Sequence, residues 1–227
     1  MKKEIVEEFK KIGRLLFDEH LVHASSGNIS MLDGDEILIT RSGALLSSLE
    51  EEDLVRVGIE KSDLDKGASM ELPVHREIYK SSKANAIIHA HPVNAIALSQ
   101  NEEKIIPQDA EGKFYLKSIP VVRVHDPIGS EEVLKFLLPL VSSGYQAVMV
   151  RGHGSFTLGE TMLDAYRLSS TLENICKIIL LSKKPAVQPA AQTSSIRSRG
   201  TGMRGSAIPP GIGVMDRSRS GRYQNNR

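Results

Sequence analysis

The residues AIIHAHP at positions 86–92 are the starting point for interpreting this chain. The short apolar run, closed by Pro92, is typical of a buried strand. Side chains alternate between the two faces of a strand, so His89 and His91 project from the same face and Ala90 points away. Two imidazoles placed in this way can bind one metal ion, although paired histidines in a strand can also be hydrogen-bonded with no metal present. A catalytic zinc typically takes three protein ligands, so a third must come from elsewhere in the chain.

The overall composition is that of an ordinary globular protein. The chain has 227 residues, of which 40% are hydrophobic and 25% charged, enough for one domain with a sizeable core. The net charge of +1 gives no strong electrostatic footprint for nucleic acid or a membrane. The single cysteine, Cys176, excludes an internal disulfide, and we interpret it as part of the core. With no signal peptide and no long apolar span, we expect a cytoplasmic protein that does not bind membranes.

The composition changes near residue 185. Residues 185–227 hold seven Arg, no Lys and one Asp, and are rich in Ser, Gly and Pro. They lack hydrophobic periodicity, so we predict a disordered tail at 185–227 after a folded domain at 1–184. We interpret the tail as a solvated segment, and an Arg-rich arm that binds RNA or another anionic surface is the alternative.

Hydrophobic periodicity predicts alternating helices and strands through residues 1–184. We expect helices near residues 5–16, 73–83, 93–98 and 160–182, and one that begins after Ser130. We expect strands at residues 29–32, 36–40, 54–59, 86–91, 119–124 and 147–150. Asp33-Gly34-Asp35 predicts a hairpin turn, and Ser48 and Glu51 have capping-box spacing. We interpret residues 106–118 as a loop.

A third histidine, His153, stands between two glycines at the end of the predicted strand 147–150. Glycine lets the backbone take angles that other residues avoid, which helps when one side chain must be aimed at a fixed point. His89, His91 and His153 are therefore the predicted metal ligands. Glu71 lies on a turn before the next predicted helix, where it can reach the metal or a substrate proton. His75, one helical turn later, is the competing ligand, and we place it second because it lies within a helix.

Three polar turns offer small hydrogen-bond donors for an anion. They are Gly27-Asn28, Ser42-Gly43 and the turn that holds Ser69. Successive backbone amides in such turns form nests that bind phosphate without any lysine. Each turn alone is weak support, because Ser, Gly and Asn occur in the turns of every protein.

The motifs together resemble the class II aldolase family, and the resemblance covers roughly residues 1–184. They are, in order, Gly27-Asn28-Ile29-Ser30, Thr40-Arg41-Ser42-Gly43, Ser69-Met70-Glu71, His89-Ala90-His91 and Gly152-His153-Gly154. The resemblance implies an α/β fold with three layers, α/β/α, around a mostly antiparallel sheet. It also implies a homotetramer with active sites at subunit interfaces.

The resemblance also implies roles for individual residues. One zinc ion per subunit would lie on His89, His91 and His153, with Glu71 at the metal as catalytic acid/base. The substrate phosphate would bind among Gly27, Asn28, Ser42, Gly43 and Ser69. Cobalt or manganese is possible in place of zinc.

The expected activity is that of an aldehyde-lyase in sugar-phosphate metabolism, of the fuculose-1-phosphate aldolase type. It would cleave a ketose 1-phosphate resembling L-fuculose 1-phosphate to dihydroxyacetone phosphate and a small aldehyde such as lactaldehyde. A divalent metal supplies an electron sink as a Lewis acid, so no Schiff-base lysine is required. The alternatives on the same metal site are a ribulose 5-phosphate type 4-epimerase and a methylthioribulose-1-phosphate dehydratase. The epimerases carry Asp at the position of Glu71, so Glu fits the aldolases better.

The chain departs from the aldolase pattern in two places. The aldolase tyrosine that protonates the aldehyde oxygen falls in residues 106–118, where Tyr115, Glu111 and Asp109 are all candidates for a second acid. The family's Ser-Ser-Glu is Ser69-Met70-Glu71 here, which removes one hydroxyl from the phosphate cradle. A scaffold protein of the adducin type is a further alternative, but it need not keep three histidines.

Overall fold

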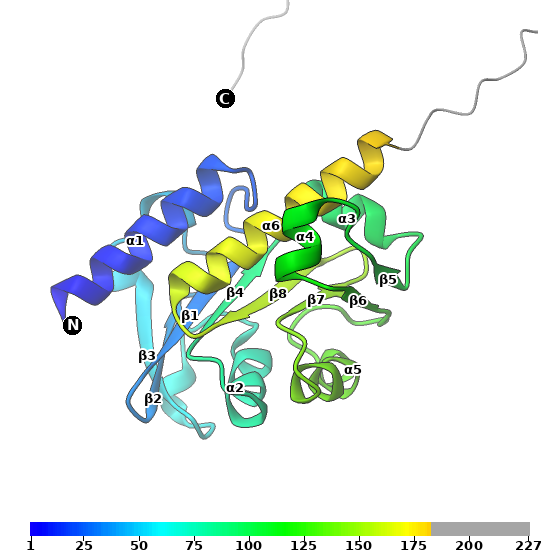
Figure 1. Cartoon of the computed structure of the whole chain (residues 1–227). Helices are drawn as coiled ribbons and strands as arrows, with labels where there is room; N and C mark the ends of the chain where they lie inside the picture. The colour runs from blue at the N-terminus through cyan, green and yellow to red at the C-terminus, as the bar shows by residue number, and fades with distance from the viewer. Residues whose placement is uncertain (183–227) are drawn as a thin grey trace, which may run out of the picture. The chain divides into compact units, whose positions relative to one another are not determined.

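The computed structural model describes residues 1–182, and the predicted tail at 185–227 lies outside the described residues (Figure 1). Eight strands form one sheet in the order β3-β2-β1-β4-β8-β7-β6-β5. The strands are β1 Asn28–Asp33, β2 Glu36–Thr40, β3 Leu54–Gly58, β4 Ala86–Ala90, β5 Lys104–Ile105, β6 Ile119–Val122, β7 Ala147–Val150 and β8 Gly154–Gly159. Only the pair β6–β7 is parallel, so the sheet is mostly antiparallel, as expected.

Helices cover both faces of this sheet and complete three layers (Figure 1). On one face lie α1 Lys3–Asp18, α3 Val93–Ser99, α4 Ala110–Tyr115 and α6 Met162–Ser182. On the other lie α2 Leu72–Ser81 and α5 Glu131–Ser142. Short 3-10 helices span Leu46–Ser48, Glu51–Asp53 and Asp63–Asp65. The α/β/α architecture implied by the motifs is therefore confirmed. Among the described residues, no helix is long and apolar enough to cross a membrane.

Strand β4 contributes side chains to the core on both faces of the sheet, because successive residues point to opposite faces. All five residues of β4 are buried, because the strand lies inside the sheet with helices on both sides. Ile88 packs into the cluster beneath α1, which includes Phe9, whereas Ile87 packs into the cluster beneath α2 and α5. The apolar stripe of α1 therefore packs on one face of the sheet, and those of α2 and α5 pack on the other.

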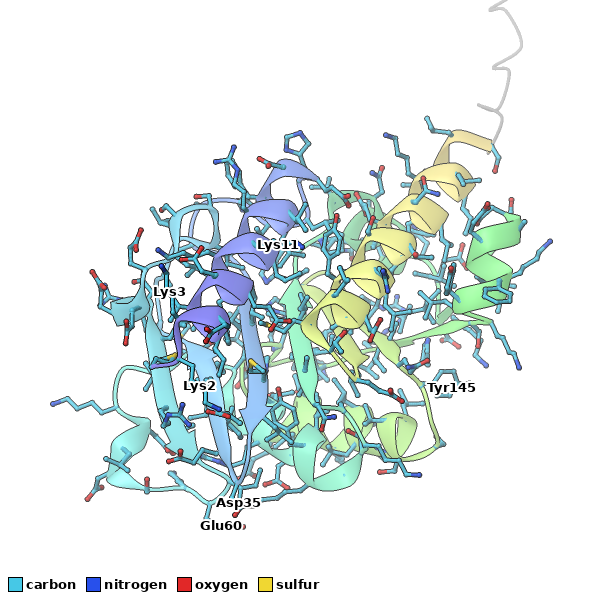
Figure 2. All side chains as sticks on the ribbon, turned by 60° about the vertical axis from the view of Figure 1, so that its left-hand side comes forward. Lys2, Lys3, Lys11, Asp35, Glu60 and Tyr145 are labelled. Atoms are coloured by element: carbon cyan, nitrogen blue, oxygen red, sulfur yellow. The ribbon has the colours of Figure 1, made fainter. Side chains whose placement is uncertain are left out.

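Strands β1 and β8 begin at one end of the sheet, and strands β2 and β4 finish at the same end. The residues just before β1 and β8 and just after β2 and β4 therefore lie near one another. Asn28 begins β1 and pairs with His89 near the end of β4, which in turn pairs with Phe156 near the start of β8. The β1–β2 hairpin turn lies at the opposite end. Figure 2 shows Asp35 of that turn at the same end of the sheet as Glu60, which follows β3. Motifs far apart in the sequence therefore meet at one edge.

The structure differs from the sequence prediction in three details. Residues 106–118 are not only a loop, because Ala110–Tyr115 form α4, with the Asp109 carboxylate as N-cap accepting from the Gly112 amide at 2.8 Å. Strands β5 and β8 and the 3-10 helix Asp63–Asp65 were not predicted. The capping box lies on Glu50 and Asp53, not on Ser48 and Glu51.

Candidate metal centre and active site

Three imidazoles converge at this end of the sheet. His89, His91 and His153 each offer one nitrogen, and these nitrogens all lie within 4.8 Å of one another. The Nε2 atoms of His89 and His91 are 2.9 Å apart. Zinc–nitrogen distances of about 2.0–2.1 Å place two tetrahedral ligands roughly 3.3 Å apart, so small ring movements fit one ion between them. His153 thus lies beside His89, near the end of β4, and His91, just after it.

Hydrogen bonding of His89 Nδ1 leaves the other ring nitrogen, Nε2, free to bind a metal. His89 Nδ1 lies 3.1 Å from the carbonyl oxygen of Ser155, to which a protonated Nδ1 donates. That tautomer carries a lone pair on Nε2, the atom that faces His91. The backbone amide of His91 donates to the Leu21 carbonyl at 2.8 Å, which fixes the chain just after β4.

The glycines on either side of His153 have distinct roles. Gly152 has φ +69°, a left-handed conformation in the turn between β7 and β8 that L side chains rarely adopt. A Cβ on Gly154 would lie 2.9 Å from His89 Cε1 and 3.0 Å from His91 Cδ2. The first glycine permits the turn that aims His153, and the second leaves room for the other two rings.

Burial keeps the three histidines neutral. Desolvation lowers the pKa of His89 well below its ordinary value, aided by the neighbouring His91 and His153. It also lowers the pKa of His91 to about 4 and lowers the pKa of His153. Neutral imidazoles are the form that binds a metal cation, so the cluster is ready to bind one at neutral pH.

Glu71 lies next to this cluster at the start of α2. It is only 3% exposed, and its Oε1 is 3.9 Å from His153 Nε2. Its Oε2 accepts a hydrogen bond from the Gly129 amide at 3.0 Å, whereas its buried Oε1 has no hydrogen-bond partner among the described residues. Burial raises the pKa of Glu71 to about 7 despite the Gly129 amide, and the charge of Asp126 adds to the rise. A carboxyl group that titrates near neutrality suits proton transfer.

His75, the competing ligand, does not join the three-histidine cluster. Its ring is fully buried in the layer between α2 and the sheet, and Nδ1 is 2.7 Å from the Ser30 hydroxyl oxygen. Desolvation lowers the pKa of His75 to about 3. The helical position turns His75 toward β1, one turn from Glu71, so its placement as second choice is consistent with the structure.

The three predicted polar turns line one pocket with the histidines. The pocket has a volume of about 280 Å³. Its walls include every residue proposed for phosphate binding, namely Gly27, Asn28, Ser42, Gly43 and Ser69. Ser69 Oγ accepts from the Glu71 amide at 3.2 Å, and Asn28 Oδ1 is buried without a partner among the described residues. An acceptor of this kind needs a donor, which a hydroxylated ligand can offer.

Several other residues that line the pocket were not singled out from the sequence. They are Ser25, Ser26, Arg41 and Ile128, and Met70, noted above for the hydroxyl that it lacks, lines the pocket as well. Arg41 forms an ion pair with Asp53 at 3.1 Å and brings a positive charge to the pocket wall. Arg41 belongs to the motif Thr40-Arg41-Ser42-Gly43. Its position as a cation beside the predicted anion-binding turn Ser42-Gly43 is the sequence signal that indicates it.

The candidates for a second acid lie elsewhere in the chain. Glu111 and Tyr115 are on α4, which packs against α6, and neither lines the metal pocket. The Tyr115 side chain is 54% exposed. Within one chain, the described residues therefore place the three-histidine cluster, a carboxylate and a polar pocket together, but not Glu111 or Tyr115.

This is the arrangement of an α/β domain with three histidines and several polar residues gathered at one end of the sheet. The family model described as "Class II Aldolase and Adducin N-terminal domain" matches residues 7–180. The chain therefore belongs to the class II aldolase and adducin N-terminal domain family, as its motifs indicated.

Individual relatives agree with this family. An L-fuculose phosphate aldolase of Methanocaldococcus jannaschii is 32% identical over 177 residues, which cover 78% of this chain and 96% of the relative. The crystal structure of L-fuculose-1-phosphate aldolase from Thermus thermophilus matches with a TM-score of 0.77 and 35% identity, over 82% of this chain and all of that one. A methylthioribulose-1-phosphate dehydratase of Bradyrhizobium is 25% identical and covers 77% of this chain and 89% of the relative. The relatives named as aldolases support a lyase enzyme.

Proposed function

We propose that this protein is a zinc-dependent aldolase that cleaves a ketose 1-phosphate resembling L-fuculose 1-phosphate. The products would be dihydroxyacetone phosphate and a small aldehyde such as lactaldehyde. The single observation that carries the proposal is the meeting of His89, His91 and His153 beside the buried, unpaired Oε1 of Glu71. The relatives named L-fuculose phosphate aldolase supply the substrate class.

Glu71 is the proposed acid/base for the carbon next to the ketone. When bound, the divalent cation supplies a Lewis acid that withdraws electrons from the substrate carbonyl. As the C3–C4 bond breaks, its electron pair moves toward C3 and the carbonyl, and the C4 hydroxyl gives its proton to the deprotonated form of the second acid assigned below. Glu71 then delivers a proton to C3, for which its raised pKa of about 7 is suited. The Gly129 amide holds Oε2, so that Oε1 is the oxygen directed toward the cluster.

The polar turns are the proposed phosphate cradle. Backbone amides and hydroxyls of Asn28, Ser42, Gly43 and Ser69 surround the pocket, and Arg41 adds a positive charge. Holding the phosphate end of the substrate fixes the reacting carbons against the metal and Glu71, which converts binding energy into orientation.

We assign the second acid to a neighbouring subunit of a homotetramer. Glu111 and Tyr115 do not line the pocket of their own chain, and Tyr115 is exposed on α4, where a second copy can receive it. The same proposal places the enzyme in the cytoplasm, in keeping with a single buried cysteine and no disulfide.

A test of this function begins with metal content and proton exchange. Purified protein should contain about one zinc per chain and catalyse exchange of the hydroxymethyl C–H of dihydroxyacetone phosphate with deuterium from D2O. Glu71→Gln should keep the metal and lose the exchange, because the amide cannot carry the proton. Exchange that survives in this variant would remove Glu71 from the mechanism.

Product analysis then separates aldolase from its alternatives. An aldolase should release dihydroxyacetone phosphate from L-fuculose 1-phosphate and leave ribulose 5-phosphate unchanged. The dehydratase requires its own assay with methylthioribulose 1-phosphate, because a relative of that name matches most of the chain. Interconversion of ribulose 5-phosphate and xylulose 5-phosphate without cleavage would identify the epimerase instead.

A further inference from the structure

The ring of Phe156 lies against His89, the most deeply buried of the three histidines. Phe156 and His89 are directly opposite each other in the pairing of β8 with β4. Their ring centroids are 4.4 Å apart with an interplanar angle of 27°, a stacked arrangement. The other two histidines contact His89 at an angle, His91 at 76° and His153 at 50°. One face of the His89 ring is therefore covered by an apolar ring.

Phe156 is itself held in place by a chain of contacts from α2. His75 lies edge-on to Phe156, with ring centroids 5.9 Å apart at 70°. His75 Nδ1 meets the Ser30 hydroxyl oxygen at 2.7 Å, and the same oxygen is 2.6 Å from the Tyr79 hydroxyl. All these side chains are buried, so the His75 ring cannot turn without breaking a buried hydrogen bond. A fixed His75 in turn limits the movement of Phe156.

Two different constraints thus act on the His89 ring. The Ser155 carbonyl selects the tautomer and holds Nδ1, but one hydrogen bond still allows the ring to tilt about it. Stacking on Phe156 restricts that tilt, because an offset stack fixes the plane of the ring. A metal ion needs His89 Nε2 at a set position relative to the ligand nitrogens of His91 and His153. Both constraints therefore contribute to the affinity of the site for the metal.

We propose that Phe156, supported by His75, is a positioning residue that orients His89 for metal binding. The inference rests on the proposed metal site. It goes beyond that site because Phe156 offers no ligand atom and does not line the pocket. Its ring acts through His89 alone, and the loss of the stack should weaken metal binding even in a correctly folded protein.

The chain offers a matched control in Phe9. Phe9 and Phe156 are both fully buried, but Phe9 packs in the cluster beneath α1. Phe9→Leu and Phe156→Leu remove the same atoms, and both should lower the thermal midpoint of the metal-free protein. Only Phe156→Leu removes a ring from His89. Phe156→Met is a second variant, in case the leucine variant fails to fold, because its flexible unbranched side chain reaches further into the space without supplying a ring plane.

The experiment measures metal affinity directly. Full-length protein freed of metal is titrated with Co²⁺, followed by visible absorption, and with Zn²⁺ in competition with a chromophoric chelator. We expect Phe156→Leu or Phe156→Met to raise the dissociation constant about 10- to 100-fold and to shift the Co²⁺ absorption bands, and Phe9→Leu to leave both unchanged.

Three results would contradict the inference in distinguishable ways. Wild-type affinity in both Phe156 variants would show that the ring is only core packing. Equal weakening in Phe9→Leu would show that the effect comes from lost stability. A wild-type protein that binds neither ion would overturn the proposed metal site and, with it, this role of Phe156.

Discussion

The backbone amide of Gly129 donates a hydrogen bond to Glu71 Oε2 at 3.0 Å, although the two residues are 58 positions apart. This contact leaves Oε1 as the oxygen nearer to His153. Gly129 has φ +58°, and a Cβ added there would lie 2.3 Å from the carbonyl oxygen of Met70, the residue before Glu71. The loop before α5 therefore determines where the carboxylate of α2 points.

Gly129→Ala should impair proton exchange more than stability. A non-glycine residue in the left-handed region costs about 1–2 kcal/mol, and the clash with Met70 also displaces Glu71. We expect metal content to stay near that of the wild type, while the exchange rate falls by up to the roughly 10²–10⁴-fold that a general base typically contributes. Denaturant unfolding and deuterium exchange into dihydroxyacetone phosphate measure the two effects.

Gly34→Ala is the control for that variant. Gly34 has φ +67°, but no atom lies within 4 Å of the position of its Cβ. The same backbone strain should appear in its unfolding free energy with no change in exchange. If both variants lost exchange equally, the Gly129–Glu71 contact would have no special role.

Removal of one histidine should abolish stoichiometric metal binding. In His153→Ala the cluster keeps only the two ligands of the β4 segment, too few for a tight zinc site. We expect elemental analysis to find about one metal per chain in the wild type and a small fraction of that in the variant. Saturating Zn²⁺ at about 1,000 times its dissociation constant should stabilise the wild type by about 4 kcal/mol and leave the variant unchanged.

His23→Ala provides the comparison for this experiment. The His23 ring lies 6.4 Å from that of His91, yet His23 is not a member of the three-histidine cluster. Its replacement should preserve metal content and the zinc-dependent stabilisation. Loss of metal in this variant would mean that the ligand set has been assigned wrongly.

Acid should destabilise the metal-free protein partly through His75. Burial lowers the pKa of His75 to about 3 from an ordinary value near 6.5, so the unfolded chain binds this proton first as the pH falls. Stability is therefore lost between about pH 6.5 and pH 3, with a limiting slope of about 1.4 kcal/mol per pH unit from this group. His75→Gln should reduce the slope of unfolding free energy against pH by up to that amount. Parallel curves for wild type and variant would contradict the assignment.

The parts of the site that could be predicted are those that follow from a short local pattern in the sequence. The two-residue spacing of His89 and His91 in a strand gives convergence on one face, and Gly152 and Gly154 mark a turn that aims His153. The contact between Gly129 and Glu71 has no local signal, because it depends on how α5 is positioned against α2. Arg41 has a local signal, as a cation beside the Ser42-Gly43 turn, but it was not among the residues predicted to bind phosphate.

The parts of the fold that were missed are short, so the patterns on which such predictions depend are weak there. In β8 only Ser155-Phe156-Thr157-Leu158 alternates polar and apolar residues, between two glycines, and all six residues of the strand are buried. Its Thr157 is a buried polar residue because the hydroxyl donates to the Ala165 carbonyl on α6 at 3.0 Å. Helix α4 has six residues, too few for its helical periodicity to be recognised in the sequence, and it forms where Gly112 packs closely against Ile175 of α6.

The cap of α4 gives a final test, which also addresses the second acid. The Asp109 carboxylate accepts from the Gly112 amide at 2.8 Å, so Asp109→Ala should cost about 0.5–2 kcal/mol of stability. Because α4 carries Glu111 and Tyr115, the same variant should lower the rate of aldol cleavage without loss of metal.

Asp109→Asn separates the cap from the acid, since the amide oxygen can still accept from Gly112 but the side chain cannot transfer a proton. If Asp109 only caps α4, Asp109→Asn should have wild-type stability and cleavage rate, and Tyr115→Phe or Glu111→Gln should lose the activity. A stable Asp109→Asn variant without activity would instead make Asp109 the second acid. Helix α4 would then serve only to hold Asp109 in place.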